Sequence, residues 1–200
     1  MRITYAFLAV LLLLSCKDKT SFESKDEAKS IGAFLESFEE ISKEELKNID
    51  LDTIQSKTKI DSIDVANFLS NDPINLSFYS NGPFGNYYSR LFKVKGFFNN
   101  YIIFYVISEN FHVFKLMAAN VDLQKDRVTS KLLISEFDPM QRQVYNTKIN
   151  DFNFEILRTF YLNNSDRLPN EDSIIVKKII ENYKINRSGI FEIISSKKIN

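Results

Sequence analysis

The sequence has very few of the side chains on which metal and catalytic sites commonly depend. Its 200 residues include one cysteine, one histidine and no tryptophan. The lone cysteine, Cys16, cannot form an internal disulfide, and zinc sites need several histidine or cysteine ligands. His112 would have to serve any Ser-His-Asp arrangement, but no Gly-x-Ser-x-Gly segment exists to present the serine. Glycine motifs for phosphates and dinucleotides are also absent. We interpret His112 as a packing or surface residue of a strand, and we predict no catalytic residue, no metal and no cofactor.

The chain also lacks an excess of charge of either sign. Its 26 basic and 26 acidic side chains balance, so we predict no nucleic-acid partner, because binding to nucleic acid relies on strong positive potential. The charges are unevenly placed. Residues 17–72 carry 8 basic and 14 acidic side chains (net −6), and residues 73–200 carry 17 basic and 12 acidic (net +5). Either an acidic helical region packs beside a basic sheet, or a basic face binds an anionic glycan or lipid headgroup.

The first sixteen residues have the features of a secretory signal. Arg2 supplies a short positive region, residues 3–14 are almost entirely apolar, and the small residue Ser15 precedes Cys16. The apolar run is shorter than the roughly twenty residues that a membrane-spanning helix needs, and a charged segment follows it. We therefore expect residues 1–15 to be a signal peptide that is removed from the mature chain.

The end of this signal, Leu13-Leu14-Ser15-Cys16, resembles the lipobox of bacterial lipoproteins, Leu-x-(Ala/Gly/Ser)-Cys. The resemblance implies signal cleavage between Ser15 and Cys16 and lipidation of Cys16. Two or three acyl chains, at about 0.8 kcal/mol per buried CH₂, would hold the protein on a membrane. We therefore expect a cell-envelope protein anchored through its N-terminal lipid in the outer membrane, at the periplasmic face or at the cell surface. Lys17-Asp18 is similar to the charged signal that sends some Bacteroidota lipoproteins to the surface.

The remaining chain is long enough for one domain, which we expect over residues 24–200, after a polar tether over residues 16–23. The first part of the domain, residues 24–72, has helical patterns. A capping box at Ser24 and Glu27 precedes apolar residues spaced by three or four. This spacing predicts a helix over 25–41 with one buried stripe, formed by Ile31, Phe34, Leu35, Phe38 and Ile41.

Two shorter helices are expected to follow. A second capping box, formed by Ser42 and Glu45, predicts a helix that ends near Lys47. Asp61 or Ser62 can cap the third helix, which ends before Pro73. Its apolar residues are Val65, Phe68 and Leu69.

From residue 87 the hydrophobic pattern is typical of strands. Eight or nine short segments rich in β-branched and aromatic residues lie between polar turns over residues 87–195. The turns are too short for crossover helices, so the sheet should be an antiparallel meander. Residues 101–107 are apolar on both strand faces, and we expect the N-terminal helix to cover one of them. The predicted fold class is therefore α+β, mainly β, with an N-terminal helical segment packed on an antiparallel β-meander of about eight strands.

The wider pattern resembles that of small uncharacterised lipoproteins of Bacteroidota. The shared features are the lipobox, a phenylalanine-rich helix, a segment ending in Phe-Leu and a closing hairpin. In this sequence they include Phe34, Phe38, Phe68-Leu69, Tyr183, Ile185, Gly189 and Phe191. The resemblance spans most of the chain and implies no particular activity.

The longest irregular stretch, residues 73–87, contains Gly82, Pro83 and Gly85. Three tyrosines lie in or beside this loop, and a tyrosine combines an apolar ring with a polar tip suited to sugars or protein partners. Our candidate ligand contacts are therefore Tyr79, Tyr87 and Tyr88. The alternative is that these tyrosines line a strand edge.

Three functions stay open from the sequence. We favour a lipid-anchored binding or interaction module of the cell envelope, whose partner is a glycan or an envelope protein. The first alternative is an envelope hydrolase that uses two carboxylates converging in one pocket. The second is a structural accessory subunit of an envelope complex, which would show an exposed apolar patch or edge strand.

Overall fold

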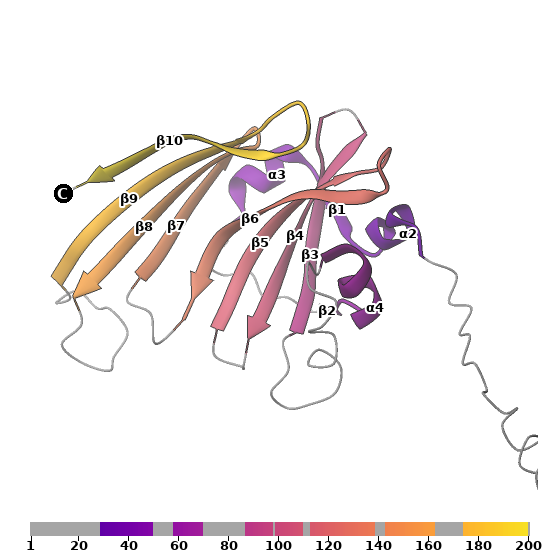
Figure 1. Ribbon diagram of the computed structural model, residues 1–200, viewed down its shortest axis with the longest axis horizontal. Coiled ribbons are helices and arrows are strands. Elements are labelled where there is room, and N and C mark those ends of the chain that lie inside the picture. The colour runs from indigo at the N-terminus through magenta and orange to yellow at the C-terminus, as the bar shows by residue number, and fades with distance from the viewer. Residues whose placement is uncertain are drawn as a thin grey trace, which may run out of the picture.

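A computed structural model describes residues 29–49, 58–69, 87–97, 99–109, 113–138, 143–162 and 174–199. These segments form an α+β fold that is mainly β, with short helices on the N-terminal side of an eight-stranded meander (Figure 1). The predicted fold class is confirmed. The expected signal peptide, cleavage site, lipidated cysteine, tether and first capping box lie outside the described residues. So do Tyr79, His112 and the glycines of the long loop.

The strands form two sheets. Sheet A has the order β1-β3-β4-β5-β6, and β2 also pairs with β3. Sheet B has the order β10-β9-β8-β7. Consecutive strands pair antiparallel from β3 to β6 and from β7 to β10, as the short turns predicted. The bounds are β1 (Glu39–Ile41), β2 (Thr58–Lys59), β3 (Tyr87–Lys95), β4 (Asn100–Glu109), β5 (Val113–Asp122), β6 (Arg127–Phe137), β7 (Gln143–Asn150), β8 (Asn153–Leu162), β9 (Ile174–Ile185) and β10 (Phe191–Ile199).

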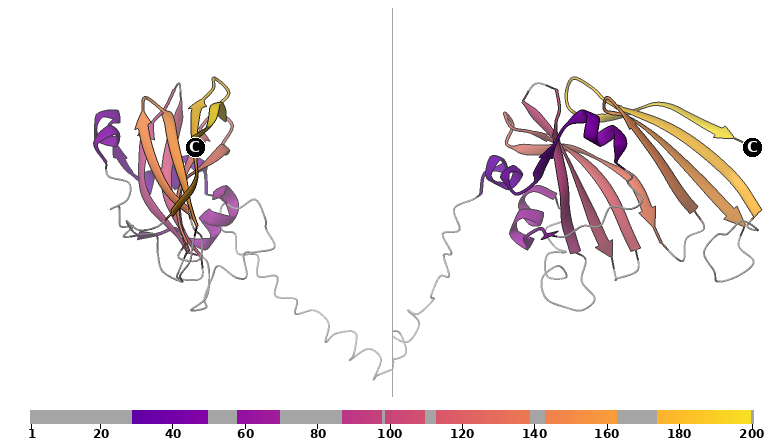
Figure 2. Two further views of the ribbon diagram at one scale, coloured as in Figure 1. Left: turned by 90° about the vertical axis from the view of Figure 1, so that its left-hand side faces the viewer. Right: turned by 180° about the vertical axis from the view of Figure 1, so that it is seen from behind.

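The two sheets lie next to each other, and short helices lie on both sides of them when the molecule is seen edge-on (Figure 2). The side chain of Thr147 on β7 joins them, because its Oγ1 donates to the Ile134 carbonyl of β6 at 2.7 Å. The turn between β7 and β8 uses two left-handed residues, Asp151 (φ 46°) and Phe152 (φ 61°). This is the backbone pattern of a tight two-residue hairpin. It places the Phe152 ring in the core.

The first helix is shorter than predicted. α2 spans Ile31–Glu36 and begins at the N-cap Ser30, whose Oγ accepts from the Ala33 amide at 3.2 Å. The prediction of helix is wrong over residues 29–30, which precede the helix, and over residues 37–41, because residues 37–38 form a turn and Glu39–Ile41 forms β1, which pairs in parallel with β3. Backbone pairing with this distant strand replaces the last helical turn. Ile31, Phe34, Leu35 and Phe38 are buried together as predicted, whereas Ile41 packs in a different cluster.

The second and third helices begin where their capping residues predict. α3 (Lys43–Asn48) has a complete capping box: Ser42 Oγ accepts from the Glu45 amide at 3.1 Å, and Glu45 Oε2 accepts from the Ser42 amide at 2.7 Å. α4 (Ser62–Asp64) starts at Asp61, whose Oδ1 accepts from the Ile63 amide at 2.8 Å. It continues as one π-helical turn, η1 (Val65–Leu69).

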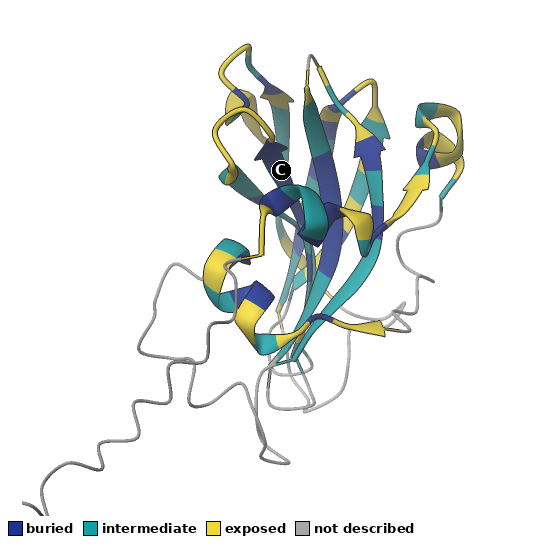
Figure 3. Ribbon diagram, turned by 90° about the vertical axis from the view of Figure 1, so that its right-hand side faces the viewer, coloured by how far each residue is buried: buried dark blue, intermediate teal, exposed yellow. Residues whose placement is uncertain are grey.

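Two hydrophobic clusters cover the two faces of sheet A. The inward segments of the strands are buried, whereas the outer faces of the helices and the turns are exposed (Figure 3). On one face, Ile103 and Tyr105 of β4 pack with α2 and η1. Phe34 lies in this cluster, with ring centroids 5.2 Å from Phe38 and 4.9 Å from Phe68. The first helix therefore covers one face of the doubly apolar strand, as predicted.

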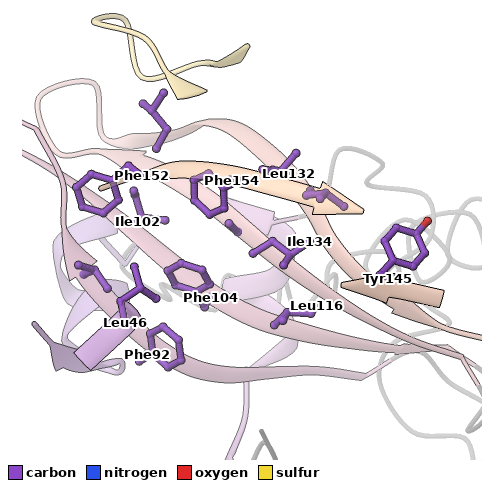
Figure 4. Packing of buried hydrophobic residues seen from close by; sticks show 14 residues of the cluster. Leu46, Phe92, Ile102, Phe104, Leu116, Leu132, Ile134, Tyr145, Phe152 and Phe154 are labelled. Atoms are coloured by element: carbon purple, nitrogen blue, oxygen red, sulfur yellow. The ribbon is translucent and has the colours of Figure 1, made fainter. Parts of the chain in front are cut away.

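The other face of sheet A packs against sheet B and α3. Ile102 and Phe104 of β4 contribute to this second cluster, with Leu46 of α3 and Phe154 of β8 (Figure 4). Phe92 and Phe104 lie 4.7 Å apart between ring centroids. Tyr145 lies at the edge of the cluster, with its hydroxyl directed away from the apolar side chains (Figure 4).

Basic side chains of sheet A bind the carbonyl groups at the helix ends. Arg90 Nη1 donates to the Ser37 carbonyl at 3.0 Å, and Lys93 Nζ donates to the Leu35 carbonyl at 2.9 Å. Lys131 donates to the Leu69 carbonyl, and burial lowers the pKa of this lysine. The last carbonyls of a helix lack intrahelical partners and attract cations. These contacts support the interpretation that the helical region packs beside a basic sheet.

Candidate functional site

A group of charged and hydroxyl-bearing side chains lies beside the apolar core, where β6 runs next to β7. We call it the polar cluster. The antiparallel register brings its members together: Tyr145 lies directly opposite Arg158, and Glu181 and Tyr183 are two residues apart and therefore share a face of β9. The cluster draws on five consecutive strands, β5 to β9, and consists of Lys115, Glu136, Gln143, Tyr145, Arg158, Glu181 and Tyr183.

Glu136 is the centre of the first half of the cluster. The Tyr145 hydroxyl donates to Glu136 Oε2 at 3.4 Å, and Gln143 Nε2 donates to the same oxygen at 3.3 Å. Lys115 Nζ lies 3.7 Å from Glu136 Oε1. Only 9% of the Glu136 side chain is exposed. This buried carboxylate therefore has both a cation and neutral donors around it.

Arg158 and Glu181 form the second half. Arg158 Nη2 makes an ion pair with Glu181 Oε2, and the Tyr183 hydroxyl donates to that oxygen at 3.2 Å. The Glu181 side chain is 13% exposed and the Arg158 side chain 29% exposed. Arg158 Nε is buried and has no hydrogen-bond partner among the residues that the structure describes.

Both tyrosines of the cluster are held in the neutral form. Burial raises the pKa of Tyr145, and the neighbouring Glu136 carboxylate raises it further. Burial also raises the pKa of Tyr183, and the Glu181 carboxylate acts in the same direction. A neutral phenol next to a carboxylate is a hydrogen-bond donor. The two hydroxyl groups therefore stabilise the two carboxylates.

Of the members of the polar cluster, the sequence pattern drew attention only to Tyr183, as part of the closing hairpin, and none was a candidate functional residue. Lys115, Tyr145 and Glu181 lie far apart in the chain, and an acidic residue in a strand is ordinary by itself. The available signal was the Glu181-x-Tyr183 spacing, which puts both side chains on one strand face. It could not show that this face turns toward Tyr145 and Arg158. Within the described segments, no group of three His, Cys, Asp or Glu side chains is placed to hold a metal ion.

The structure separates the two candidate tyrosines that it describes. Tyr87 and Tyr88 are neighbours in β3, so their side chains point to opposite faces of sheet A. The Tyr88 ring packs on the core and lies 6.0 Å from the Tyr105 ring. The Tyr87 ring lies 3.9 Å below Lys59 Nζ. The two side chains therefore do not form one aromatic platform, and contact of either with a ligand stays a prediction.

Exposed aliphatic side chains are concentrated on sheet B. We call this set the apolar strip. Val176 on β9 and Ile194 on β10 are each 60% exposed, but they lie toward opposite ends of the sheet, because Ile174 pairs with Leu162 at one end and Ile193 pairs with Tyr183 at the other. Thirteen large apolar residues are exposed in the part of the chain that the structure describes, and seven of them lie on the strands of sheet B: Val144, Leu162, Ile174, Ile175, Val176, Ile193 and Ile194. Exposed apolar side chains that lie together on a folded domain, as Leu162 and Ile174 do in directly opposite positions of β8 and β9, commonly mark an interaction site.

No family model, curated protein or solved structure matches this chain. The class that the structure defines is a mainly β member of the α+β folds, with two adjoining antiparallel sheets. Among the described residues, no helix is long and apolar enough to cross a membrane. A fold class does not determine an activity, so the functional argument rests on the polar cluster and the apolar strip.

Proposed function

We propose that this chain is a lipid-anchored protein of the cell envelope that acts as a binding or interaction module. The observation that carries the proposal is the apolar strip, because large apolar side chains such as Val176 and Ile194, each 60% exposed, would be stabilised by burial against a partner. The Leu13-to-Cys16 motif supports the anchor, through its resemblance to a lipobox. An anchored module meets its partner, an envelope protein or a glycan, at the membrane surface.

The alternative of a carboxylate hydrolase has one observation in its favour. Glu136 and Glu181 belong to the same polar cluster, as paired catalytic carboxylates would. However, Glu136 is already bound by Tyr145, Gln143 and Lys115, and Glu181 by Arg158 and Tyr183. A network in which each carboxylate has a cation and a hydroxyl partner stabilises the junction of the two sheets. We therefore assign the polar cluster a structural role and place binding at the apolar strip.

The anchor is tested by changing Cys16→Ala in cells fed a fatty-acid analogue. The unchanged chain and a Ser21→Ala control should both take up the label and fractionate with membranes. The Cys16→Ala chain should take up no label, because the acylated thiol is gone. Labelled Cys16→Ala protein would contradict the lipobox.

Binding is tested with a glycan array and with capture from solubilised envelopes. Replacing apolar-strip residues, as in Ile175→Ser with Val176→Ser, should abolish binding of any partner found. Ile63→Ser is the matched control, because Ile63 is also exposed (50%) but lies on α4. Equal binding by the two variants, or none by the unchanged chain in either assay, would contradict the proposal.

The same surface would also serve an accessory subunit of an envelope complex. That alternative predicts a partner that copurifies in fixed stoichiometry and does not exchange. A module that binds reversibly should instead release its partner on dilution.

A further inference from the structure

The last strand of sheet B is a long, open edge. β10 spans nine residues, and residues 192–198 are all exposed. One side of β10 pairs with β9, and no other strand among the described residues pairs with its second side. The free amide and carbonyl groups of such an edge form a template for another strand. Lysines and bulges are common ways of protecting an edge, and β10 has both: Lys197, Lys198 and a register shift between Ile193 and Ser195.

The charges along β10 have opposite signs at its two ends. Glu192 lies near the beginning, Lys197 and Lys198 lie near the end, and the residues between them are uncharged. Two copies of β10 in parallel would place Glu192 beside Glu192 and the lysines beside the lysines. Two antiparallel copies centred near Ile194 and Ser195 place Glu192 of each copy opposite the lysine pair of the other. Because such a pair has two-fold symmetry, the favourable contact occurs twice.

We propose that two copies of this chain associate by antiparallel pairing of their β10 strands. The two B sheets then continue into one sheet of eight strands. The bulge leaves two neighbouring registers, in which Glu192 faces either Lys197 or Lys198, and both keep opposite charges together. Ile193 and Ile194 of each copy come to lie beside the serines and the lysine stems of the other, so part of the apolar strip is covered. This pairing does not depend on the lipid anchor.

The net charge around β10 makes the contacts between Glu192 and the two lysines necessary for association of two copies. Residues 174–199 carry six basic and two acidic side chains, a net charge of +4. Of the two acidic residues, Glu181 is bound by Arg158, and Glu192 accepts a hydrogen bond from the Asn186 amide group. Neither Lys197 nor Lys198 has an ion pair in the described part of the chain. Two copies would repel each other here unless Glu192 of each met the lysines of the other.

The test uses charge reversal in the full lipidated chain, purified in a non-ionic detergent, with the mass of the protein measured by sedimentation. The unchanged chain should dimerise. Glu192→Lys alone, and Lys197→Glu with Lys198→Glu, should each weaken dimerisation by about tenfold or more, because two attractive pairs become repulsive. An equimolar mixture of the two variants should form heterodimers, since each supplies the charge that the other lacks. Lys148→Glu, at a side chain 79% exposed on β7, is the control and should dimerise like the unchanged chain.

A cross-link gives the geometry independently. Ser195→Cys places a thiol near the two-fold axis, so mild oxidation in native membranes should give a disulfide-linked dimer. Ser188→Cys, in the preceding turn, should not form such a dimer. The unchanged chain shows how much disulfide-linked dimer forms through Cys16. A monomer at every concentration, a charge-reversed variant that dimerises normally, or a mixture no better than its components would each overturn the proposal. A monomer that binds vesicles containing phosphatidylglycerol, and loses this binding with Lys197→Glu and Lys198→Glu, would instead assign the edge to an anionic membrane.

Discussion

The turn between β9 and β10 is held against sheet A by one glycine, and replacing it should destabilise the whole domain. Gly189 has a left-handed backbone (φ +76°), and its carbonyl oxygen accepts from Thr129 Oγ1 at 2.9 Å and from Ser130 Oγ at 2.7 Å. A Cβ at this position would lie within 3.0 Å of Asn120 Nδ2 and 3.1 Å from Thr129 Oγ1. Asn120 cannot move freely, because it is 1% exposed and donates to Thr129 Oγ1 at 2.7 Å.

The cost of Gly189→Ala follows from these contacts. A left-handed conformation costs an alanine about 1–2 kcal/mol. Displacing Asn120 breaks a buried hydrogen bond, which adds about 0.5–1.5 kcal/mol. The free energy of unfolding should therefore fall by about 1.5–3.5 kcal/mol. At about 2–4 °C per kcal/mol for a chain of this size, the melting temperature should fall by about 3–14 °C.

Gly32→Ala is the matched control. Gly32 lies in α2, and an added Cβ there would have its nearest neighbour, Ser30 Oγ, at 3.6 Å. This change should stabilise the domain by about 0.5–1 kcal/mol, because glycine is a poor helix former. Both variants can be followed by urea denaturation with circular dichroism, since the chain has no tryptophan for fluorescence.

Two results would refute this reasoning. If Gly189→Ala unfolded within about 0.5 kcal/mol of the unchanged chain, the turn would not be packed on β5 and β6 as the structure has it. The second test combines Gly189→Ala with Asn120→Ala. Because the second change removes the amide that obstructs the new Cβ, the double variant should lose less stability than the sum of the single losses. Strict additivity would show that Asn120 is not the obstacle.

Three further predictions concern the core, the polar cluster and the turn between β5 and β6. Phe38→Ala should destabilise the domain by about 3–5 kcal/mol in urea denaturation, because Phe38 is 3% exposed and contacts Phe34. Glu39 is exposed, so Glu39→Ala should change the stability by less than about 0.5 kcal/mol in the same assay. Glu181→Gln should lower the free energy of unfolding by about 1–3 kcal/mol, because it leaves Arg158 without its counter-ion. Glu155→Gln breaks an exposed pair with Lys148 and should lower it by at most about 0.5 kcal/mol. Equal losses in thermal melts would show that the polar cluster stabilises the fold no more than an exposed ion pair does. A hydrogen bond from Lys125 lowers the pKa of Asp122, so the aspartate should stabilise the fold above its unfolded pKa of about 3.9 and lose this effect as the pH falls through its lower folded pKa. The stability difference between the unchanged chain and Asp122→Asn should therefore be about 1 kcal/mol at pH 7 and shrink toward pH 3; a difference that grows on acidification would contradict the shift.

Much of the fold could be predicted because the interactions that specify it are local. The capping box of Ser42 and Glu45 contains its own hydrogen-bond partners, so α3 forms where the four-residue pattern predicts. The strands from β3 to β10 form where the sequence has strand patterns. Within each sheet, the turns between consecutive strands are too short for anything but antiparallel pairing. The residues on either side of Glu181 form one strand, β9, because no turn residue between them breaks the chain.

Only the tertiary structure decided the features that depend on distant residues. Helix over 39–41 was favoured by the apolar spacing, but the edge of β3 offers those residues a full set of backbone hydrogen bonds that no local pattern reports. The division into two sheets after β6, the polar cluster drawn from five strands and the open edge of β10 arise in the same way. The sequence by itself determined which residues can be helix, strand or turn. The packing of the whole chain set which face of each strand is buried and which charged side chains form ion pairs. These contacts join residues that are distant in the sequence, so they form only when the sheets bring those residues together.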